Sequence, residues 1–136
     1  MDWIDYPHWS HVPPRAWPWP NFTPPELASR GNGAIRLQRA ALDTLQTLRD
    51  ALGQPMHITS AYRDPIHNRR VGGARFSRHT LGQAFDISLA HQDRERLRAL
   101  ARNAGFTGFG LYQTFLHLDT GPSRRWFGQN AKELWS

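Results

Sequence analysis

The sequence contains no cysteine. This excludes disulfide bonds and thiolate metal sites, so any metal ion must be held by histidine and carboxylate side chains. Seven histidines and eleven acidic residues make up that pool. The chain also lacks any apolar run of about 18 residues, which excludes a membrane-spanning helix of ordinary length.

The composition is that of a folded protein with an anionic partner. With 136 residues, of which 39% are hydrophobic and 21% charged, the chain suits one globular unit with its own core. The net charge of +6 favours anionic partners, and charge alone does not separate nucleic acid from anionic wall polymers. No nucleic-acid-binding motif accompanies the charge, so we predict no nucleic-acid partner.

The first 22 residues differ in composition from the rest. They hold four of the six tryptophans and five of the ten prolines, without helical or alternating periodicity. This predicts an extended arm at 1–22 and a folded domain at 23–136. Two interpretations of the arm remain open: its rings pack on the domain and cover the core, or they dock onto a sugar polymer or another protein.

Periodicity and capping residues predict the elements of the domain. Thr23, Pro24 and Glu26 form a capping-box pattern, which begins a short helix that ends near 31–33. The other expected elements are a helix at 34–52, a strand at 56–60, a structured loop at 61–78, a strand at 84–89, a helix at 93–104 and a strand at 113–119. Gly108 and Gly110 indicate turns. This order favours an α+β fold, a small antiparallel sheet with flanking helices.

Two of these strands carry polar groups that could hold a metal ion. In a strand at 84–89, Asp86 lies on the face opposite the apolar row, and in a strand at 113–119 so does His117. His79 ends the loop that leads into the first strand. Two imidazoles and a carboxylate suit catalytic zinc, which uses three protein ligands and keeps an open position. As a bare spacing, this pattern is weak evidence.

A longer motif adds to this evidence. After the segments Ile58–Arg63 and Asn68–Gly73, the segment Ser77–Ile87 contains the pattern S-x-H-x-x-G-x-A-x-D. This resembles the signature of the zinc D-Ala-D-Ala carboxypeptidase family. The segment Phe115–Trp126 resembles the closing motif of a subgroup common in phages and prophages. The resemblance covers about residues 22–127 and leaves the arm outside.

The resemblance implies both a fold and an activity. The fold would be α+β, related to hedgehog and lysostaphin-like metallopeptidases. The activity would be zinc-dependent hydrolysis of the stem peptide or cross-link of peptidoglycan, as a carboxypeptidase or an endolysin-like endopeptidase. We expect peptidoglycan peptide, and in a phage setting other phage proteins, as partners.

The resemblance also assigns roles to individual residues. His79, Asp86 and His117 would bind Zn²⁺. Arg63 would contact a substrate carbonyl or carboxylate, since a guanidinium is permanently charged and offers a fixed fork of donors. Ser77 would support the site by hydrogen bonding and help to bind substrate. We expect Trp126 to belong to the core.

One position departs from the family pattern. Several members carry an acidic general base three residues before the last histidine ligand, and here that position is Thr114. Asp119 shares a strand face with His117 and is the best local substitute for moving a proton, ahead of Tyr112. The alternative is that Asp119 orients His117 or an arginine.

The location and the competing function are expectations from context. The first residues lack a basic stretch and an apolar stretch, so we expect synthesis in the cytoplasm without a secretory signal. The protein would then reach the wall after release through a membrane pore, or as part of a virion. The competing function is a phage or prophage structural component that binds wall with weak or no catalysis.

Overall fold

A five-stranded sheet forms the centre of the chain in the computed structural model, which describes residues 2–135. Its strand order is β3-β4-β6-β5-β7. The bounds are Ile58–Ser60 for β3, Ala84–Ser88 for β4, Phe115–Asp119 for β6, Gly108–Leu111 for β5 and Arg124–Phe127 for β7. Neighbouring strands are antiparallel except for β5 and β7, which are parallel. The α+β class expected from the sequence is confirmed.

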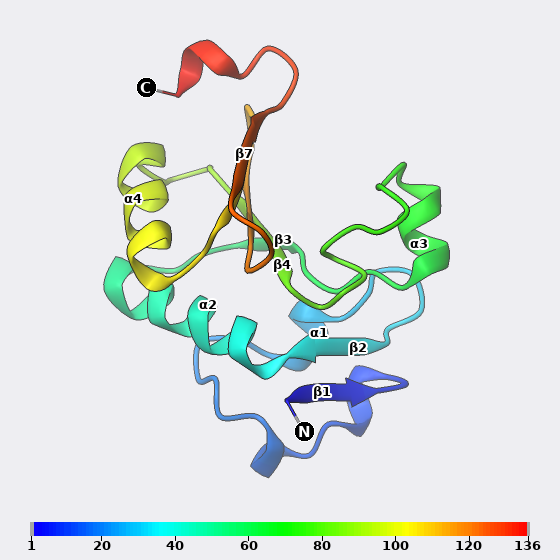
Figure 1. Ribbon diagram of the computed structural model, residues 1–136. Helices are drawn as coiled ribbons and strands as arrows, with labels where there is room; N and C mark the ends of the chain where they lie inside the picture. Colours follow the sequence, from blue (N-terminus) through cyan, green and yellow to red (C-terminus); the bar gives the residue numbers. More distant parts are fainter. Residues whose placement is uncertain (1, 136) are drawn as a thin grey trace.

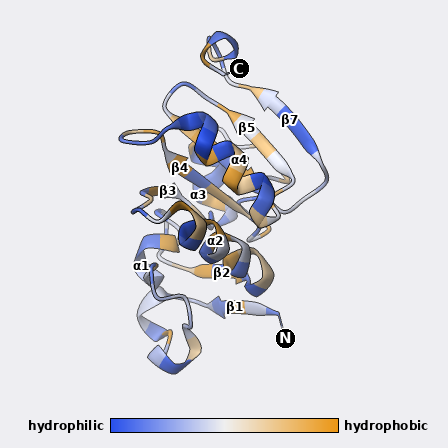
Figure 2. Cartoon of the chain, turned by 90° about the vertical axis from the view of Figure 1, so that its left-hand side faces the viewer, coloured by the Kyte–Doolittle hydropathy of each residue, from blue (hydrophilic) through white to orange (hydrophobic). Residues whose placement is uncertain are grey.

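Two long helices cover one side of the sheet. Helix α2 (Arg39–Leu52) packs against α4 (Arg94–Ala104), and α3 (Pro65–Arg70) lies on the other side (Figure 1). The apolar faces of α2 and α4 turn toward the sheet (Figure 2). Helix α4 begins and ends where the sequence predicts, with Asp93 accepting from the backbone N–H of Arg96 and with Gly105 in the left-handed conformation at its end.

The predicted helix at 34–52 is wrong in its first residues. Strand β2 (Ile35–Gln38) occupies them, and α2 begins only at Arg39. Ile35 and Leu37 are fully buried and alternate with partly exposed residues, which is a strand pattern. The pairing partner of β2 is β1, an element that the composition of the arm did not predict.

The N-terminal arm contains regular structure, which corrects the prediction of an arm without elements. Strand β1 (Trp3–Tyr6) pairs antiparallel with β2, and two short 3₁₀ helices follow, η1 (Trp9–His11) and η2 (Pro14–Ala16). Ile4, Trp19 and Phe22 lie in the main hydrophobic core. The interpretation that the arm packs on the domain is thereby confirmed for Trp19, while the division at residue 22 stays a prediction.

Three further elements differ from the predictions. Helix α1 (Pro24–Leu27) has the predicted capping box but ends before 31–33, and the loop predicted at 61–78 contains α3. The turns predicted at Gly108 and Gly110 are instead part of β5. A Cβ at Gly108 would overlap the Asp119 carboxylate, and one at Gly110 would overlap the Trp126 ring, so only glycine fits these strand positions.

The last residues fold back over the sheet. A 3₁₀ helix, η3 (Lys132–Leu134), leads to the buried Trp135, whose indole N–H donates to the Tyr112 carbonyl at 3.0 Å. Among residues 2–135, no helix is long and apolar enough to cross a membrane.

Candidate metal centre

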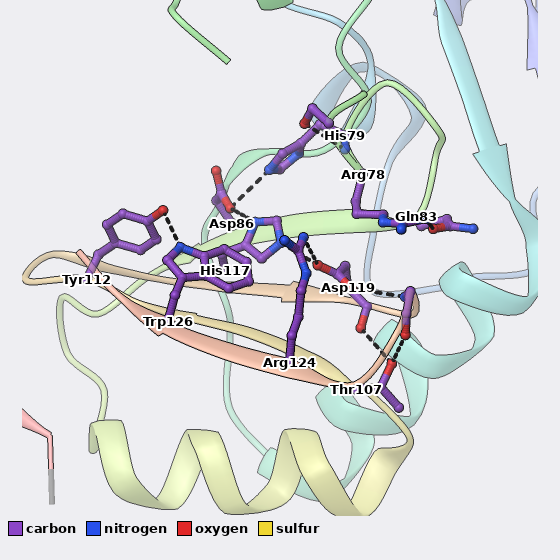
Figure 3. A network of polar contacts seen from close by, with 12 residues as sticks. Arg78, His79, Gln83, Asp86, Thr107, Tyr112, His117, Asp119, Arg124 and Trp126 are labelled. Carbon is purple, nitrogen blue, oxygen red and sulfur yellow. Dashed lines mark hydrogen bonds and ion pairs between the residues drawn. The ribbon is translucent and has the colours of Figure 1, made fainter. Parts of the chain in front are cut away.

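The register of two strands brings two of the expected ligands together. Strands β4 and β6 pair so that Asp86 lies directly opposite His117. Both side chains project from the face of the sheet that points away from α4, as Figure 3 shows. The apolar neighbours of Asp86 on β4, Phe85 and Ile87, are fully buried on the helix side. The alternation that packs the core therefore also places the two polar groups on one face.

The third expected ligand comes from the loop before β4. His79 is 3% exposed, and its Nε2 lies 3.2 Å from Asp86 Oδ1. His117 Nδ1 lies 3.1 Å from the same oxygen. One ligand atom from each of the three residues can be chosen so that all lie within 4.8 Å of one another. The structure thus gathers His79, Asp86 and His117 at one point.

The far nitrogens of both imidazoles are held by acceptors. His79 Nδ1 lies 2.7 Å from the Ala61 carbonyl oxygen, and His117 Nε2 lies 2.7 Å from Asp119 Oδ2. If those nitrogens carry the protons, His79 Nε2 and His117 Nδ1 present lone pairs toward Asp86. Metal-binding histidines are typically oriented in this way, by a carbonyl or carboxylate on the other ring nitrogen. The donor set therefore fits a divalent cation such as zinc.

The electrostatics of the centre favour positive charge between the three groups. Burial raises the pKa of Asp86, but the charge and hydrogen bonds of His79 and His117 lower it more, so its net pKa lies well below the ordinary value. Burial lowers the pKa of His117, but hydrogen bonds to Asp119 and Asp86 outweigh it and raise the pKa. A metal cation at this point would interact with the Asp86 carboxylate, which is also the acceptor for an imidazole proton.

Asp119 lies behind His117 and is fully buried. Its Oδ2 accepts from His117 and from Arg124 at 3.3 Å, and its Oδ1 accepts from the Gly121 backbone N–H at 2.9 Å. Burial raises the pKa of this carboxyl, but His117, Gly121 and Arg124 lower it more, so the net pKa is lowered. Both oxygens are therefore committed to neighbours within the chain.

Arg63 contacts the other carboxylate oxygen of Asp86, Oδ2, whereas both histidines contact Oδ1. Its guanidinium donates to Asp86 Oδ2 at 3.3 Å, to Ser60 Oγ at 3.1 Å and to Asn68 Oδ1 at 3.3 Å. These bonds use three of its five N–H groups, and its side chain is 18% exposed toward the cleft. Ser77 Oγ accepts from the His79 backbone N–H at 3.1 Å. The roles of Arg63 and Ser77 toward substrate stay predictions.

A cleft of about 600 Å³ opens over the centre. Tyr112, Phe115 and Trp126 form one wall, which we call the aromatic wall, and residues 71–74 and 76–78 contribute to the rim of the cleft. The Tyr112 ring stacks on Phe115 with centroids 4.2 Å apart. Trp126 lies 5.0 Å from the His117 ring and is partly exposed, so the prediction that it belongs to the core is wrong.

Neither the aromatic wall nor the role of Asn68 was predicted from the sequence. Trp126 follows Asp119 by seven residues on another strand, and only the parallel pairing of β5 with β7 brings it beside His117. Asn68 is 2% exposed, and its amide donates to the Ala74 carbonyl at 2.7 Å. The motif N-x₃-G-G, from Asn68 to Gly73, was the available signal for a loop closed by an asparagine side chain.

Thr114, which the resemblance described above places where several members of that family carry an acidic residue, is exposed in the turn before β6. It does not line the cleft. Among the described residues that do, Asp86 is the one carboxylate.

Comparison with known proteins agrees with this geometry. Residues 20–119 match the family model described as peptidase M15. The chain is 33% identical over 106 residues to the peptidoglycan L,D-endopeptidase MepK of Escherichia coli K12, covering 71% of this chain and 58% of that protein. It is 35% identical over 88 residues to the zinc D-Ala-D-Ala carboxypeptidase of Streptomyces albus G, covering 60% of this chain and 34% of that protein.

The aligned part thus amounts to 58% of the length of the first relative and less of the second. The family model, by contrast, matches well over half of this chain. The chain therefore belongs to the peptidase M15 family, and its residues His79, Asp86 and His117 form a cluster that could hold a metal ion.

Proposed function

We propose that this chain hydrolyses peptide bonds of peptidoglycan with a zinc ion held by His79 Nε2, Asp86 and His117 Nδ1. The observation that carries the proposal is the convergence of three ligand atoms within 4.8 Å at the base of an open cleft. The relatives named as a peptidoglycan endopeptidase and a zinc carboxypeptidase support the metal and the substrate class. Zinc bound there supplies Lewis acidity that activates water at neutral pH.

The side chains around the centre divide the remaining work. Arg63 has two N–H groups left for a substrate carbonyl or carboxylate, and it fixes Asp86 through Oδ2. Tyr112 Oη accepts from Trp126 Nε1 at 2.8 Å, so its own O–H is left to donate. Among the described residues no acceptor takes that hydrogen, and we assign it to the substrate carbonyl oxygen in the cleft.

Asp119 acts in this scheme through His117. Both its oxygens are engaged and its side chain is fully buried, so it holds the His117 ring and its Nε2 proton in place. The competing prediction, that Asp119 carries a proton to the leaving amine, requires that carboxylate to reach the cleft.

The test combines metal content with digestion of purified wall sacculi. Wild-type protein should contain about one zinc per chain and release either free D-alanine or stem peptides, which separates carboxypeptidase from endopeptidase. His79→Ala should lose both zinc and activity. His57→Ala replaces an exposed histidine outside the cleft and should keep both. Wild type without zinc and without released product would refute the proposal.

A second candidate function is binding of the wall without turnover, as in a structural component of a phage. The specific observation in its favour is that Asp86 is the one acidic residue lining the cleft in the described part of the chain. Wall pull-down that survives EDTA, with no cleavage by zinc-loaded protein, would support this function. Finding the protein in purified virions would add the phage setting.

A further inference from the structure

A second hollow lies on the other side of the sheet from the metal centre. It has a volume of about 530 Å³ and opens between the end of α4 and the start of β7. No acidic residue lines it among those the structure describes. Four arginines do: Arg98, Arg102, Arg124 and Arg125. We call this the arginine hollow. Neither the metal centre nor the aromatic wall accounts for it.

The guanidinium groups of the arginine hollow are held against aromatic rings. Arg102 lies 5.5 Å from the Phe109 ring centroid, and Arg125 lies 5.4 Å from that of Phe127. Both arginines are exposed on the surface. A guanidinium that rests on a ring face keeps its N–H edges available for hydrogen bonds. Arg102 and Arg125 are therefore oriented to receive a planar or tetrahedral oxyanion.

The other two arginines are partly neutralised. Arg98 pairs with Glu95 at 3.5 Å, and Arg124 pairs with Asp119 at 3.3 Å. The side chain of Arg124 is still 48% exposed, and it lies 4.4 Å from the Trp126 ring centroid. The local excess of positive charge thus rests on Arg102 and Arg125, with Arg124 at the border.

Arg124 also connects the arginine hollow to the catalytic cleft, because it lines both. Strand β7 is the edge of the sheet, and within residues 2–135 no strand pairs beyond it. An extended polymer can therefore cross this edge at Arg124, with one part in the cleft and the next part in the arginine hollow. Figure 3 shows the Arg124 side chain reaching from β7 to Asp119, beside His117.

We infer that the arginine hollow binds an oxyanion, a carboxylate or a phosphodiester, on the wall polymer whose peptide occupies the cleft. Arginine suits both groups, because its planar fork forms two parallel hydrogen bonds to either. The identity of the polymer rests on the proposed function, whereas the anion site rests on the hollow alone. A duplex nucleic acid is a different partner, and the position of the hollow beside a peptidase cleft favours the wall polymer.

The test compares two charge-matched double variants. Arg102→Gln/Arg125→Gln removes two charges from the arginine hollow, and Arg69→Gln/Arg70→Gln removes two from exposed positions on α3 that line neither the hollow nor the cleft. Cosedimentation with sacculi at low salt should weaken about tenfold for the first pair and less than twofold for the second. Equal losses would mean that net charge alone drives binding, which would overturn the inference.

Two further arms identify the anion and the partner. The first arm uses sacculi stripped of phosphate polymers. The difference in binding between the two double variants should remain if the anion is a carboxylate, and it should disappear if the anion is a phosphodiester. Duplex DNA is the competitor. If DNA displaces sacculi and its binding depends equally on Arg102 and Arg125, the wall assignment is wrong.

Hydrolysis separates this inference from the proposed function. A short soluble stem peptide reaches the cleft alone, so Arg102→Gln/Arg125→Gln should cleave it within twofold of wild type while its digestion of sacculi falls. If wild type cleaves nothing, the proposed function fails, and the binding comparison still decides the arginine hollow. Binding by Arg102→Gln/Arg125→Gln as tight as wild type would refute the anion site even in an active enzyme.

Discussion

Trp126 Nε1 donates a hydrogen bond of 2.8 Å to Tyr112 Oη, so the phenol of Tyr112 is an acceptor on one side and a donor toward the cleft. Two neighbours hold Tyr112 in place. The Phe115 ring stacks on the Tyr112 ring, and the Trp135 indole N–H donates a hydrogen bond to the backbone carbonyl of Tyr112. The phenol oxygen is therefore held in position before substrate arrives, and a preorganised donor is the condition for electrostatic stabilisation of a developing oxyanion.

Tyr112→Phe should keep the ring stack and remove only the O–H. We expect kcat on a stem peptide to fall about 10²-fold, as for the loss of one oxyanion donor, with zinc content unchanged. The measurement is steady-state hydrolysis of the stem peptide by zinc-saturated protein. Tyr6→Phe makes the same chemical change on β1 and should stay within twofold of wild type. An unchanged kcat for Tyr112→Phe would remove the phenol from the mechanism.

Asp119→Asn distinguishes orientation of His117 from proton transfer. If Asp119 orients the ligand, zinc affinity should fall about 10-fold to 100-fold, and most activity should return at saturating zinc. If Asp119 moves the proton instead, zinc affinity should hold while kcat at saturating zinc falls about 10²-fold to 10⁴-fold. We expect the first outcome, because the carboxylate is fully buried. Chelator competition and steady-state kinetics give the two readouts, with the exposed Asp50→Asn as control.

Local sequence patterns predicted helix α4 and the two strands that carry Asp86 and His117. Helix α4 has its cap at Asp93 and its stop at Gly105, and the alternation in β4 and β6 put Asp86 and His117 on the polar faces. These features follow from short-range geometry, so they can be predicted from a single sequence. The register that sets Asp86 opposite His117 depends on long-range pairing and became visible only in the fold.

The wrong predictions fall where contacts between distant parts of the chain decide the structure. Strand β5 contains Gly108 and Gly110, and glycine weakens a strand assignment unless a close neighbour requires it. The required neighbours are Asp119 and Trp126, on other strands. Residues 35–38 fit either period, because Ile35 and Leu37 extend the apolar stripe of α2, and the pairing with β1 decides for a strand.

The loop that carries Arg63 and His79 depends on a buried carboxyl. Asp64 Oδ2 accepts from Ser29 Oγ at 2.5 Å, and Oδ1 accepts from the His67 backbone N–H at 2.9 Å, which caps α3. Burial raises the pKa of Asp64, but these two donors lower it more, so the net pKa is below the ordinary value. Its stabilising effect is therefore complete above about pH 4 and is lost as the pH falls through the lowered pKa.

Asp64→Asn should therefore destabilise the protein by about 1 kcal/mol at pH 7, because hydrogen bonds to a charged acceptor exceed neutral ones by that amount. The free energies of unfolding of wild type and variant should converge as the pH falls toward 3. Urea unfolding at several pH values measures the difference in unfolding free energy between wild type and variant. Asp86 and Asp119 are present in both proteins, so their own pH dependence cancels from this difference. A gap that is independent of pH would exclude the charge of Asp64 as its cause.

Two tryptophans of the N-terminal arm, Trp19 and Trp9, differ in burial. Trp19 is 2% exposed, and its indole N–H donates to Asp43 Oδ1 at 2.9 Å, whereas Trp9 is 37% exposed. Trp19→Ala should lower the free energy of unfolding by about 3–5 kcal/mol, since it empties a core site. Trp9→Ala should cost less than about 1 kcal/mol.

Urea unfolding of the two variants gives the comparison, and similar losses would mean that the arm does not pack through Trp19.

The Trp9 variant also decides the open alternative for the arm. Because this ring is exposed and its removal should leave the fold intact, a tenfold loss of sacculus binding by Trp9→Ala would mark it as a docking residue. Unchanged binding would leave the arm a purely structural role at that position, with β1 and Trp19 as the parts that stabilise the domain.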